Sequence, residues 1–289
     1  MLKNLFTNKK KLSKEIFQLF LYGNEDNEVA CYNPPQKMLD FYDELPTMMD
    51  KELVFYKYLL LKPDRYKDTE LKLFKKGFKE TLDVEGMSAG GMKLATQRFK
   101  DFIEGEKIPL DFFPVKVKGE RRYIMMWRRL PVYIDYEADL KQSEFYEDGR
   151  VVASGIVYRS DVLEYRKIKM FSLQTHTSIY LTGEIRQKLE ENDFLFNYHE
   201  KKVTQKKLNP KKVEKDLLYA IKKSRESGFN ENSRKWYVQI DESLEKVLIE
   251  EGDKEVLERF RKEMKGAWKK DFERYEKGLM KPDERITYW

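Results

Sequence analysis

The densest run of aromatic and aliphatic residues lies near the middle of the chain and constrains the fold most. Residues 112–145 read FFPVKVKGERRYIMMWRRLPVYIDYEADLKQSEF. Within them, the apolar residues 112–117 and 123–127 flank a Lys-Gly-Glu turn, a pattern typical of a β-hairpin. Residues 132–136 then alternate apolar and polar side chains, as strands do. The run therefore predicts the core of a sheet.

Amphipathic segments on both sides of this run predict helices. One apolar face consists of Leu12, Ile16, Leu19 and Phe20, with Ser13 placed to cap the helix and Gly23 to end it. Ser88 is placed to cap a second helix, whose face contains Met92, Ala95, Phe99, Phe102 and Ile103. Thr182 is placed to cap a third helix, which runs to Asn192 with Ile185 and Leu189 on one face. The pattern indicates an α+β fold with a central mixed or antiparallel sheet and flanking helices.

The composition changes after Tyr198. A lysine-rich linker, HEKKVTQKKLNPKK, leads into apolar residues at helical spacing, first from Val213 to Ile221. A short apolar stretch at 236–240 and another helix ending at Gly252 follow. Residues 256–279 repeat apolar side chains every three or four positions, which predicts one long helix. We expect an α+β domain at residues 1–200 and a helical region at 201–289.

Two parts of the chain resemble each other. Met87-Ser88, a helical segment and then FFPV parallel Tyr180-Leu181-Thr182, a shorter helix and then FLFNY. In both, a cap is followed by a helix and an aromatic strand. The similarity is compatible with an ancient duplication and with a recurring supersecondary unit.

Charge is distributed unevenly along a composition typical of a folded protein. Hydrophobic residues make up 40% and charged residues 37% of the 289 positions. The net charge of +6 arises after residue 200, where 24 Lys and Arg face 18 Asp and Glu, whereas residues 1–200 contain 33 of each. This excess indicates either a surface for an acidic partner or a set of solvated helices.

The sequence also limits where the protein acts. Its uninterrupted apolar runs span a few residues, far fewer than the roughly 20 that cross a bilayer, so we expect no membrane span. The basic start of the chain predicts a helix and not a signal peptide, because Lys14, Glu15 and Gln18 interrupt its apolar patch. Cys31 is the only cysteine, which excludes an intrachain disulfide and fits a reducing compartment.

Candidate reaction centres are weak. Gly90 and Gly91 could cradle a phosphate, but a phosphate loop continues with lysine and then serine or threonine, and here Met92-Lys93-Leu94 follow. Carboxylates between Asp135 and Asp148 could hydrolyse a glycosidic bond or hold a cation, yet turns commonly carry such acids. His176 and His199 have no second ligand at metal spacing. We therefore predict no catalytic residue, no metal site and no cofactor.

A family resemblance adds a functional expectation. The order FFPVKV, YIMMW, IDYEADLKQSEFYEDG, MFSL and IYLTGEIRQKLEENDFLFNY, over roughly residues 82–198, resembles a bacterial family of immunity proteins from polymorphic toxin systems, the immunity family eleven type. The chain departs from it at Phe171-Ser172, where the family often has Phe-Arg, and at Asn192-Asp193, where a glycine often precedes the last strand.

The resemblance implies a cytoplasmic, non-enzymatic protein that binds a cognate toxin and neutralises it by stoichiometric occlusion. For the binding surface we name the acidic residues Glu144, Glu147 and Asp148, or the basic region after residue 200. The alternative is a nucleic-acid-binding protein of a bacterial defence or regulatory system, which would use the same basic region.

Overall fold

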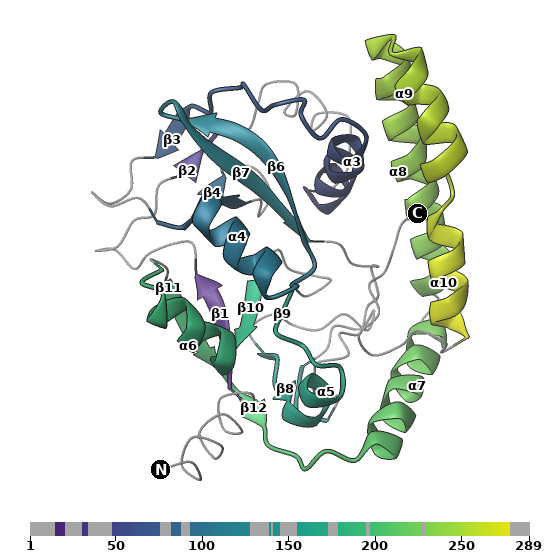
Figure 1. Cartoon of the computed structure of the whole chain (residues 1–289). Coiled ribbons are helices and arrows are strands. Elements are labelled where there is room, and N and C mark those ends of the chain that lie inside the picture. Colours follow the sequence, from purple (N-terminus) through teal and green to yellow (C-terminus); the bar gives the residue numbers. More distant parts are fainter. Residues whose placement is uncertain are drawn as a thin grey trace. The chain divides into compact units, whose positions relative to one another are not determined.

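The computed structural model has an α+β fold in which largely antiparallel sheets are flanked by helices (Figure 1). It describes residues 15–20, 31–33, 48–75, 82–87, 93–127, 139, 141–144, 155–172, 179–194, 197–226 and 229–277. By contacts the chain divides into unit 1 (residues 1–20, 129–233 and 272–286) and unit 2 (residues 21–128, 234–271 and 287–289). Both units combine distant segments, so the expected division at residue 200 runs through unit 1. Whether residues 1–200 fold without the later helices stays a prediction.

Unit 2 is built on a six-stranded sheet of order β3-β2-β4-β5-β7-β6. Its strands are β2 (Cys31–Tyr32), β3 (Leu73–Lys75), β4 (Val84–Met87), β5 (Lys93–Ala95), β6 (Leu110–Val117) and β7 (Glu120–Trp127). The predicted hairpin is confirmed, since β6 and β7 pair from Leu110 opposite Trp127 to Val117 opposite Glu120. Lys118 and Gly119 form its tip with φ of 52° and 79°, and a left-handed pair of this kind matches the twist of the two strands.

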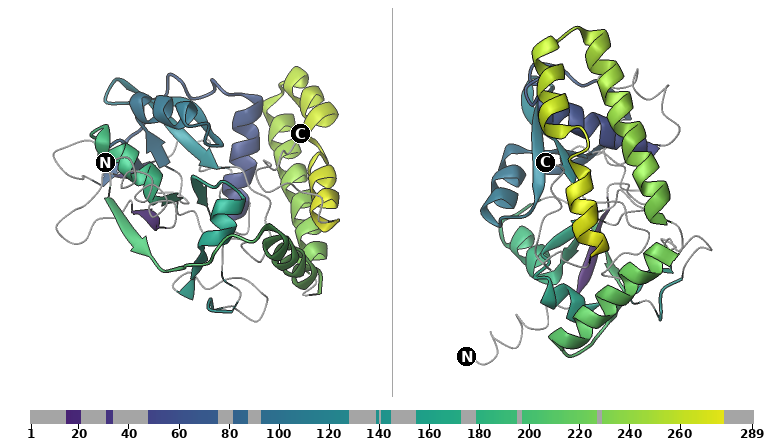
Figure 2. Two further views of the ribbon diagram at one scale, coloured as in Figure 1. Left: turned by 60° about the horizontal axis from the view of Figure 1, so that its bottom comes forward. Right: turned by 90° about the vertical axis from the view of Figure 1, so that its right-hand side faces the viewer.

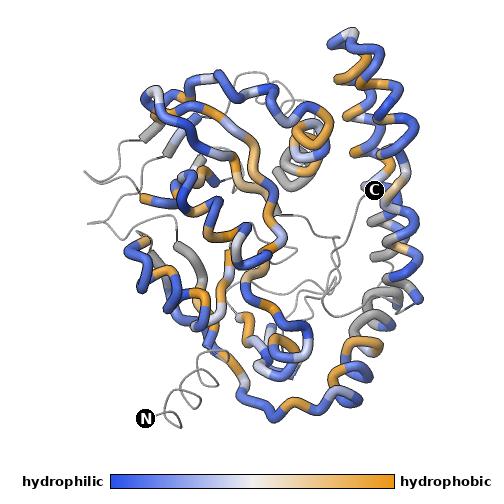
Figure 3. Tube along the Cα trace, in the orientation of Figure 1, coloured by the Kyte–Doolittle hydropathy of each residue, from blue (hydrophilic) through white to orange (hydrophobic). Residues whose placement is uncertain are grey.

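Helices cover this sheet in unit 2. Helix α4 (Gln97–Gly105) buries Phe99 and Ile103. Helix α3 (Met48–Leu61), whose residues had an ambiguous pattern, shares a core with the sheet and with α8 (Phe229–Glu251) and η2 (Phe260–Met264). That core includes Phe55, Tyr58, Phe113, Val115, Ile124, Ile240, Leu244 and Phe260. In Figure 3 the coloured part of helix α3 is largely hydrophobic.

Unit 1 contains a four-stranded sheet and a two-stranded one. The four strands, in the order β11-β1-β10-β9, are β11 (Asn197–Lys201), β1 (Ile16–Phe20), β10 (Ile179–Thr182) and β9 (Met170–Ser172). Strands β8 (Tyr158–Arg159) and β12 (Val203–Thr204) pair in parallel. The helices are α5 (Ser160–Tyr165), α6 (Gly183–Glu191) and α7 (Pro210–Glu226). Helix α6 follows Thr182 and buries Ile185 and Leu189, as predicted.

Two expected helices differ from the structure. Leu12, Ser13 and Gly23 of the first lie outside the described residues. Residues 16–20 form β1, a strand that pairs with β10 on one edge and β11 on the other. Because both of its faces are covered, Ile16 and Phe17 are both buried, which removes the alternation that marks a half-exposed strand. The second helix starts at Gln97, because Thr96 caps it by accepting a hydrogen bond from the Phe99 amide at 3.2 Å. Ser88, Gly90 and Gly91 lie outside the described residues.

The helical region after residue 200 differs from the prediction in two places. Residues 236–240 belong to the continuous helix α8 and not to a separate apolar stretch. The expected long helix is divided into α9 (Lys254–Arg259), η2 and α10 (Trp268–Glu276). The break lies at Gly266, which has φ of 76° and whose amide donates to Asp241 Oδ2 of α8 at 2.8 Å. Figure 2 shows α9 and the start of α10 running back along α8.

Asp241 also forms a buried ion pair. Lys57 Nζ of α3 lies 2.6 Å from Asp241 Oδ1, and their side chains are 0% and 5% exposed. Trp268 Nε1 donates to the other carboxylate oxygen at 3.2 Å. Burial lowers the pKa of Lys57, and the charge of Asp241 opposes this effect. One carboxylate therefore joins α3, α8 and the break before α10.

We expect Asp241→Asn to lower the free energy of unfolding by about 3 to 5 kcal/mol, because it leaves the Lys57 ammonium buried without its counterion. Adding Lys57→Met should restore part of the loss. Urea unfolding measures both effects. Glu104→Gln serves as a control, since the pair between Lys100 and Glu104 is exposed on α4 and should contribute less than about 1 kcal/mol. Equal losses in the two single variants would contradict this account.

Glu85 of β4 makes stability depend on pH. Its side chain is buried, and desolvation raises its pKa to about 7 although Arg122 and Lys118 act in the opposite direction. The folded protein therefore binds a proton that the unfolded chain releases near pH 4.5. The bound proton therefore adds to the free energy of unfolding. Its contribution is complete below the unfolded pKa and is lost as the pH rises through about 7.

We expect the free energy of unfolding to fall by up to about 3 kcal/mol between pH 4.5 and 8 because of this one group. Urea unfolding at several pH values measures the fall, and Glu85→Gln should flatten it. Carboxylates whose pKa is lowered, such as those of Asp139 and Glu251, titrate below this window. The same slope in the wild type and the variant would show that Glu85 is not responsible.

Candidate functional site

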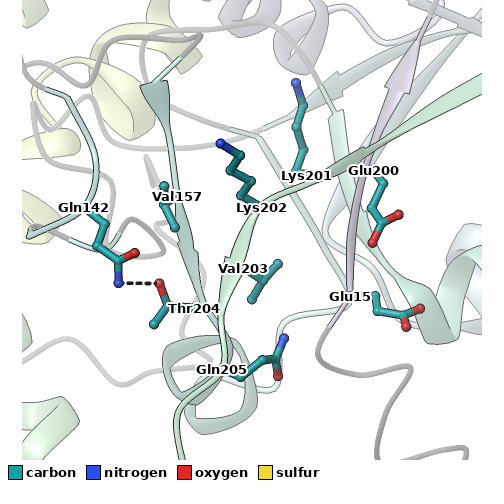
Figure 4. Close-up of a pocket in the computed structure, with 9 residues that line it drawn as sticks. All are labelled: Glu15, Gln142, Val157, Glu200, Lys201, Lys202, Val203, Thr204 and Gln205. Carbon is teal, nitrogen blue, oxygen red and sulfur yellow. Dashed lines mark hydrogen bonds between the residues drawn. The ribbon is translucent and has the colours of Figure 1, made fainter.

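A pocket in unit 1 lies beside the segment that joins β11 to β12. It has a volume of about 810 Å³. Its lining consists of Glu15, Gln142, Val157, Glu200, Lys201, Lys202, Val203, Thr204 and Gln205 (Figure 4). Six of these residues are consecutive, because the chain leaves the edge of the four-stranded sheet at Lys202 and continues as β12. The pocket is therefore formed mainly by the end of β11 and the segment that continues into β12.

The pocket contains charges of both signs. Figure 4 shows the side chains of Lys201 and Lys202 extending to one side, whereas Glu15 and Glu200 point to the other. Lys201 is partly buried, and desolvation lowers the pKa of its ammonium group. Neither lysine forms an ion pair with a described carboxylate. An anionic group that entered beside Lys201 would favour its charged form.

One wall of the pocket is fixed by a turn that contains Asp139 and residues 141–144. Gln142 Nε2 donates to Thr204 Oγ1 at 3.0 Å, and Lys206 Nζ lies 2.6 Å from Asp139 Oδ2. The hydroxyl of Ser143 accepts from the Val157 amide at 3.0 Å. Asp139 is buried, and its pKa is lowered because the hydrogen bonds to Lys206 and to the Lys141 amide outweigh desolvation. These bonds hold the turn against residues 155–157 and 202–206.

A second buried cluster connects this region to α7. Arg159 donates from Nε and Nη2 to the two carboxylate oxygens of Asp161, at 3.0 and 2.8 Å. Its Nη1 donates to Asp216 of α7 at 2.7 Å. The Tyr165 hydroxyl donates to Glu214, also of α7, at 2.7 Å, which raises the pKa of that hydroxyl to about 12. Arg159 thereby holds Asp216 against the protein, whereas Glu214 stays exposed.

The side of α7 that lies away from the buried Val213 carries lysines and two exposed apolar residues. We call this surface the α7 face, and it consists of Lys211, Lys215, Leu218, Tyr219 and Lys222. Leu218 is 53% and Tyr219 52% exposed, and all three lysines are exposed. Positions 211, 215, 218 and 222 lie on one side of a helix, with 219 beside them. Figure 3 shows the alternation of hydrophobic and hydrophilic residues along α7.

The acidic residues expected to bind a partner are only partly described. Glu144 is exposed, and its amide donates to the Gly155 carbonyl oxygen at 3.2 Å. Its stem lies so close to Gly155 that a Cβ there would come within 2.8 Å of Glu144 Cβ. Glu147 and Asp148 lie outside the described residues. Glu144 is thus at the turn beside the pocket, and its role in binding stays a prediction.

The remaining candidates are scattered. His199 is an exposed residue of β11, whereas His176 and the side chain of Cys31 lie outside the described part of the chain. Among the described residues, no three His, Cys, Asp or Glu side chains gather as metal ligands. No described helix has the length and apolar character of a membrane span.

The pocket and the α7 face were not predicted residue by residue. The lysine-rich composition after Tyr198 is the one signal that pointed to them. Comparison with known proteins assigns no family: no family model matches the chain, and no curated protein matches it. The geometry describes a polar pocket and a basic, partly apolar helix face, and both features suit binding.

We expect Asp139→Ala to lower the free energy of unfolding by roughly 1 to 3 kcal/mol, because the Lys206 ammonium and the Lys141 amide lose their acceptor. Hydrogen exchange should become faster at Lys141 and Ser143, whose amides bond to Asp139. Exchange in α4 of unit 2 provides the internal control and should stay unchanged. Unchanged protection at residues 141–143 would show that Asp139 does not hold the turn.

Proposed function

We propose that this protein binds a cognate bacterial toxin and neutralises it by occlusion. The observation that carries the proposal is the α7 face, where Leu218 and Tyr219 are more than half exposed between lysines. Exposed apolar side chains framed by charges are typical of protein–protein interfaces. The resemblance of residues 82–198 to toxin-immunity proteins supplies the class of partner.

The charges of α7 indicate an acidic partner surface. Arg159 engages Asp216 on the buried side of the helix. In the first half of α7, the Glu214 carboxylate lies beside the exposed lysines and accepts from the uncharged Tyr165 hydroxyl, and the three lysines of the α7 face outnumber it. Glu226 lies 3.8 Å from Lys222, but both side chains are exposed and the pair is weak. An acidic toxin surface would be attracted by the lysines, which accelerates association and excludes basic partners. Tyr219 and Leu218 would provide the desolvated centre of the contact.

A second candidate function is nucleic-acid binding by the same helix. Lysines spaced along one side of α7 suit contacts with phosphates, and the excess of 24 basic over 18 acidic residues after position 200 favours it too. The two candidate functions differ in whether binding depends on Leu218. Phosphate contacts depend on charge and fall steeply with salt, whereas a protein interface also requires the apolar centre.

We expect the triple variant Lys211→Glu, Lys215→Glu and Lys222→Glu to weaken binding of the cognate toxin by at least roughly a hundredfold, mainly by slowing association. Leu218→Ala with Tyr219→Ala should weaken it mainly by accelerating dissociation. Co-purification and surface plasmon resonance at several salt concentrations measure these effects.

The matched control is Lys254→Glu, Lys262→Glu and Lys270→Glu, which makes the same change of charge at exposed lysines of α9, η2 and α10. It should bind the toxin nearly as the wild type does. Equal losses in both triple variants would contradict the placement on α7. Binding of nucleic acid that tolerates the change at Leu218 and Tyr219, without binding of the toxin, would favour the second function.

A further inference from the structure

The two units contain the same five-element module. The first module comprises β4, β5, α4, β6 and β7, and its strands lie in the order β4-β5-β7-β6. The second comprises β9, β10, α6, β11 and β1, with the order β9-β10-β1-β11. All six strand pairs in the two modules are antiparallel. In each, a nine-residue helix connects the second strand to the edge strand.

The modules agree residue by residue. Outside β7 and β1, counterparts are separated by 86 positions, as Thr96 and Thr182 are. Both threonines occupy the N-cap position, although only the Thr96 side chain accepts a hydrogen bond there. The Thr96 amide donates to the Asp83 carbonyl oxygen and the Thr182 amide to that of Lys169, both at 3.0 Å. Pairing follows the same register, since Leu94 lies opposite Glu85 and Tyr180 opposite Phe171. The agreement extends well beyond a similar order of elements.

A cluster of side chains is repeated as well. In the first module, Phe112 and Tyr123 meet edge to face at 6.4 Å and 87°, with Lys100 Nζ 5.5 Å from the Tyr123 ring. In the second, Tyr198 and Phe17 meet at 5.2 Å and 86°, with the Arg186 guanidinium 4.7 Å from the Phe17 ring. Each cation also forms a salt bridge with a glutamate four residues later in its helix, Lys100 with Glu104 and Arg186 with Glu190.

The modules differ in how the central strand is connected. Strand β7 follows β6 directly through the tip at Lys118 and Gly119. Its counterpart β1 precedes the rest of its module by about 150 residues and is joined to it by no hairpin. Pairing matches nonetheless: Ala95 lies opposite Tyr123, and Leu181 opposite Phe17. The second module is therefore a circular permutation of the first.

We propose that β10 and β11 form a strand-binding slot, and that its ligand is an extended peptide with an apolar residue followed by an aromatic one. In this structure β1 occupies the slot with Ile16 and Phe17. The backbone of β1 pairs along both edges, at four positions with β10 and five with β11. Phe17 enters the cluster of Arg186 and Tyr198, and Ile16 is fully buried on the other face.

The first module defines what the slot accepts. Tyr123 stands where Phe17 does, so an aromatic ring beneath the helix cation is common to both modules. A tyrosine at position 17 should therefore bind, whereas alanine should not, because it removes the ring from between Arg186, Tyr198 and the sheet. This inference does not depend on the identity of the partner proposed above.

The slot is tested with the full chain carrying a protease site inserted between Asn24 and Glu25. After cleavage, the fragment that contains β1 should remain bound during gel filtration. A fluorescent peptide of residues 11–23 in excess should then replace it, as followed by anisotropy. We expect the Phe17→Tyr peptide to bind within a fewfold of the wild-type peptide, and the Phe17→Ala peptide at least about a hundredfold more weakly. A scrambled peptide is the composition control.

Loss of the fragment while the remaining chain keeps its circular dichroism spectrum and thermal transition would overturn the proposal. So would equal binding of the Phe17→Tyr and Phe17→Ala peptides. Co-expression of residues 1–24 and 25–289 as separate chains gives a second measurement that does not depend on cleavage. Their co-purification would support the slot, and recovery of folded 25–289 alone would overturn it.

Discussion

Each four-stranded module depends on a central strand that is hydrogen-bonded along both edges. Such a strand needs a partner along each edge, and in both modules it is also buried on both faces, as Ile124 and Met125 of β7 and Ile16 and Phe17 of β1 show. In unit 2, β7 meets this requirement through a hairpin that fixes its register locally. In unit 1, β1 meets it from a distant part of the sequence, and its register is fixed only by its neighbours and by Phe17 beneath Arg186. Loss of β1 would leave the facing edges of β10 and β11 unpaired and would open the core. This explains why β1 is paired along both edges although it is far from these strands in the sequence.

In unit 2 the corresponding constraint is a buried charge. Asp241 accepts from Lys57, Gly266 and Trp268, so one carboxylate fixes the positions of α3, α8 and the break before α10. Nearby, Glu251 accepts from the Tyr58 hydroxyl at 2.8 Å and pairs with Lys62 at 2.7 Å. These contacts join residues almost 200 positions apart. The aliphatic and aromatic core provides most of the stability by burial, whereas the polar contacts specify which helix faces meet, because an unpaired partner would be costly.

The sequence predicted those elements whose signals are local. The hairpin at residues 110–127 has its turn between two apolar strands, and α6 has its cap and its apolar face within a dozen residues. A similarity between the segments that begin at Met87-Ser88 and at Tyr180-Leu181-Thr182 was visible too, but it placed Ser88 opposite Thr182, whereas in the structure Thr96 is the counterpart. The predictions that were wrong concern elements that depend on distant partners. The sequence of β1 has a helix-like pattern, and its strand conformation follows from pairing with β10 and β11. The break at Gly266 depends on Asp241. The same holds for the site. The lysines of α7 were evident from composition, but their exposure follows from how the helix packs: Val213 is buried, and Arg159 binds Asp216 beside it.

The repeat also explains why the pocket lies where it does. Val115 of β6 is fully buried in the core that contains α3, and its counterpart 86 positions later is Lys201. A lysine at a position that packs in the first module cannot be enclosed without a partner, because burial of an unpaired ammonium group is costly. The second module accordingly leaves this position open to a pocket, and the pKa of Lys201 is lowered by the burial that remains. The two modules thus use this position differently. The first uses it for packing, and the second presents a partly desolvated cation at the edge of its sheet.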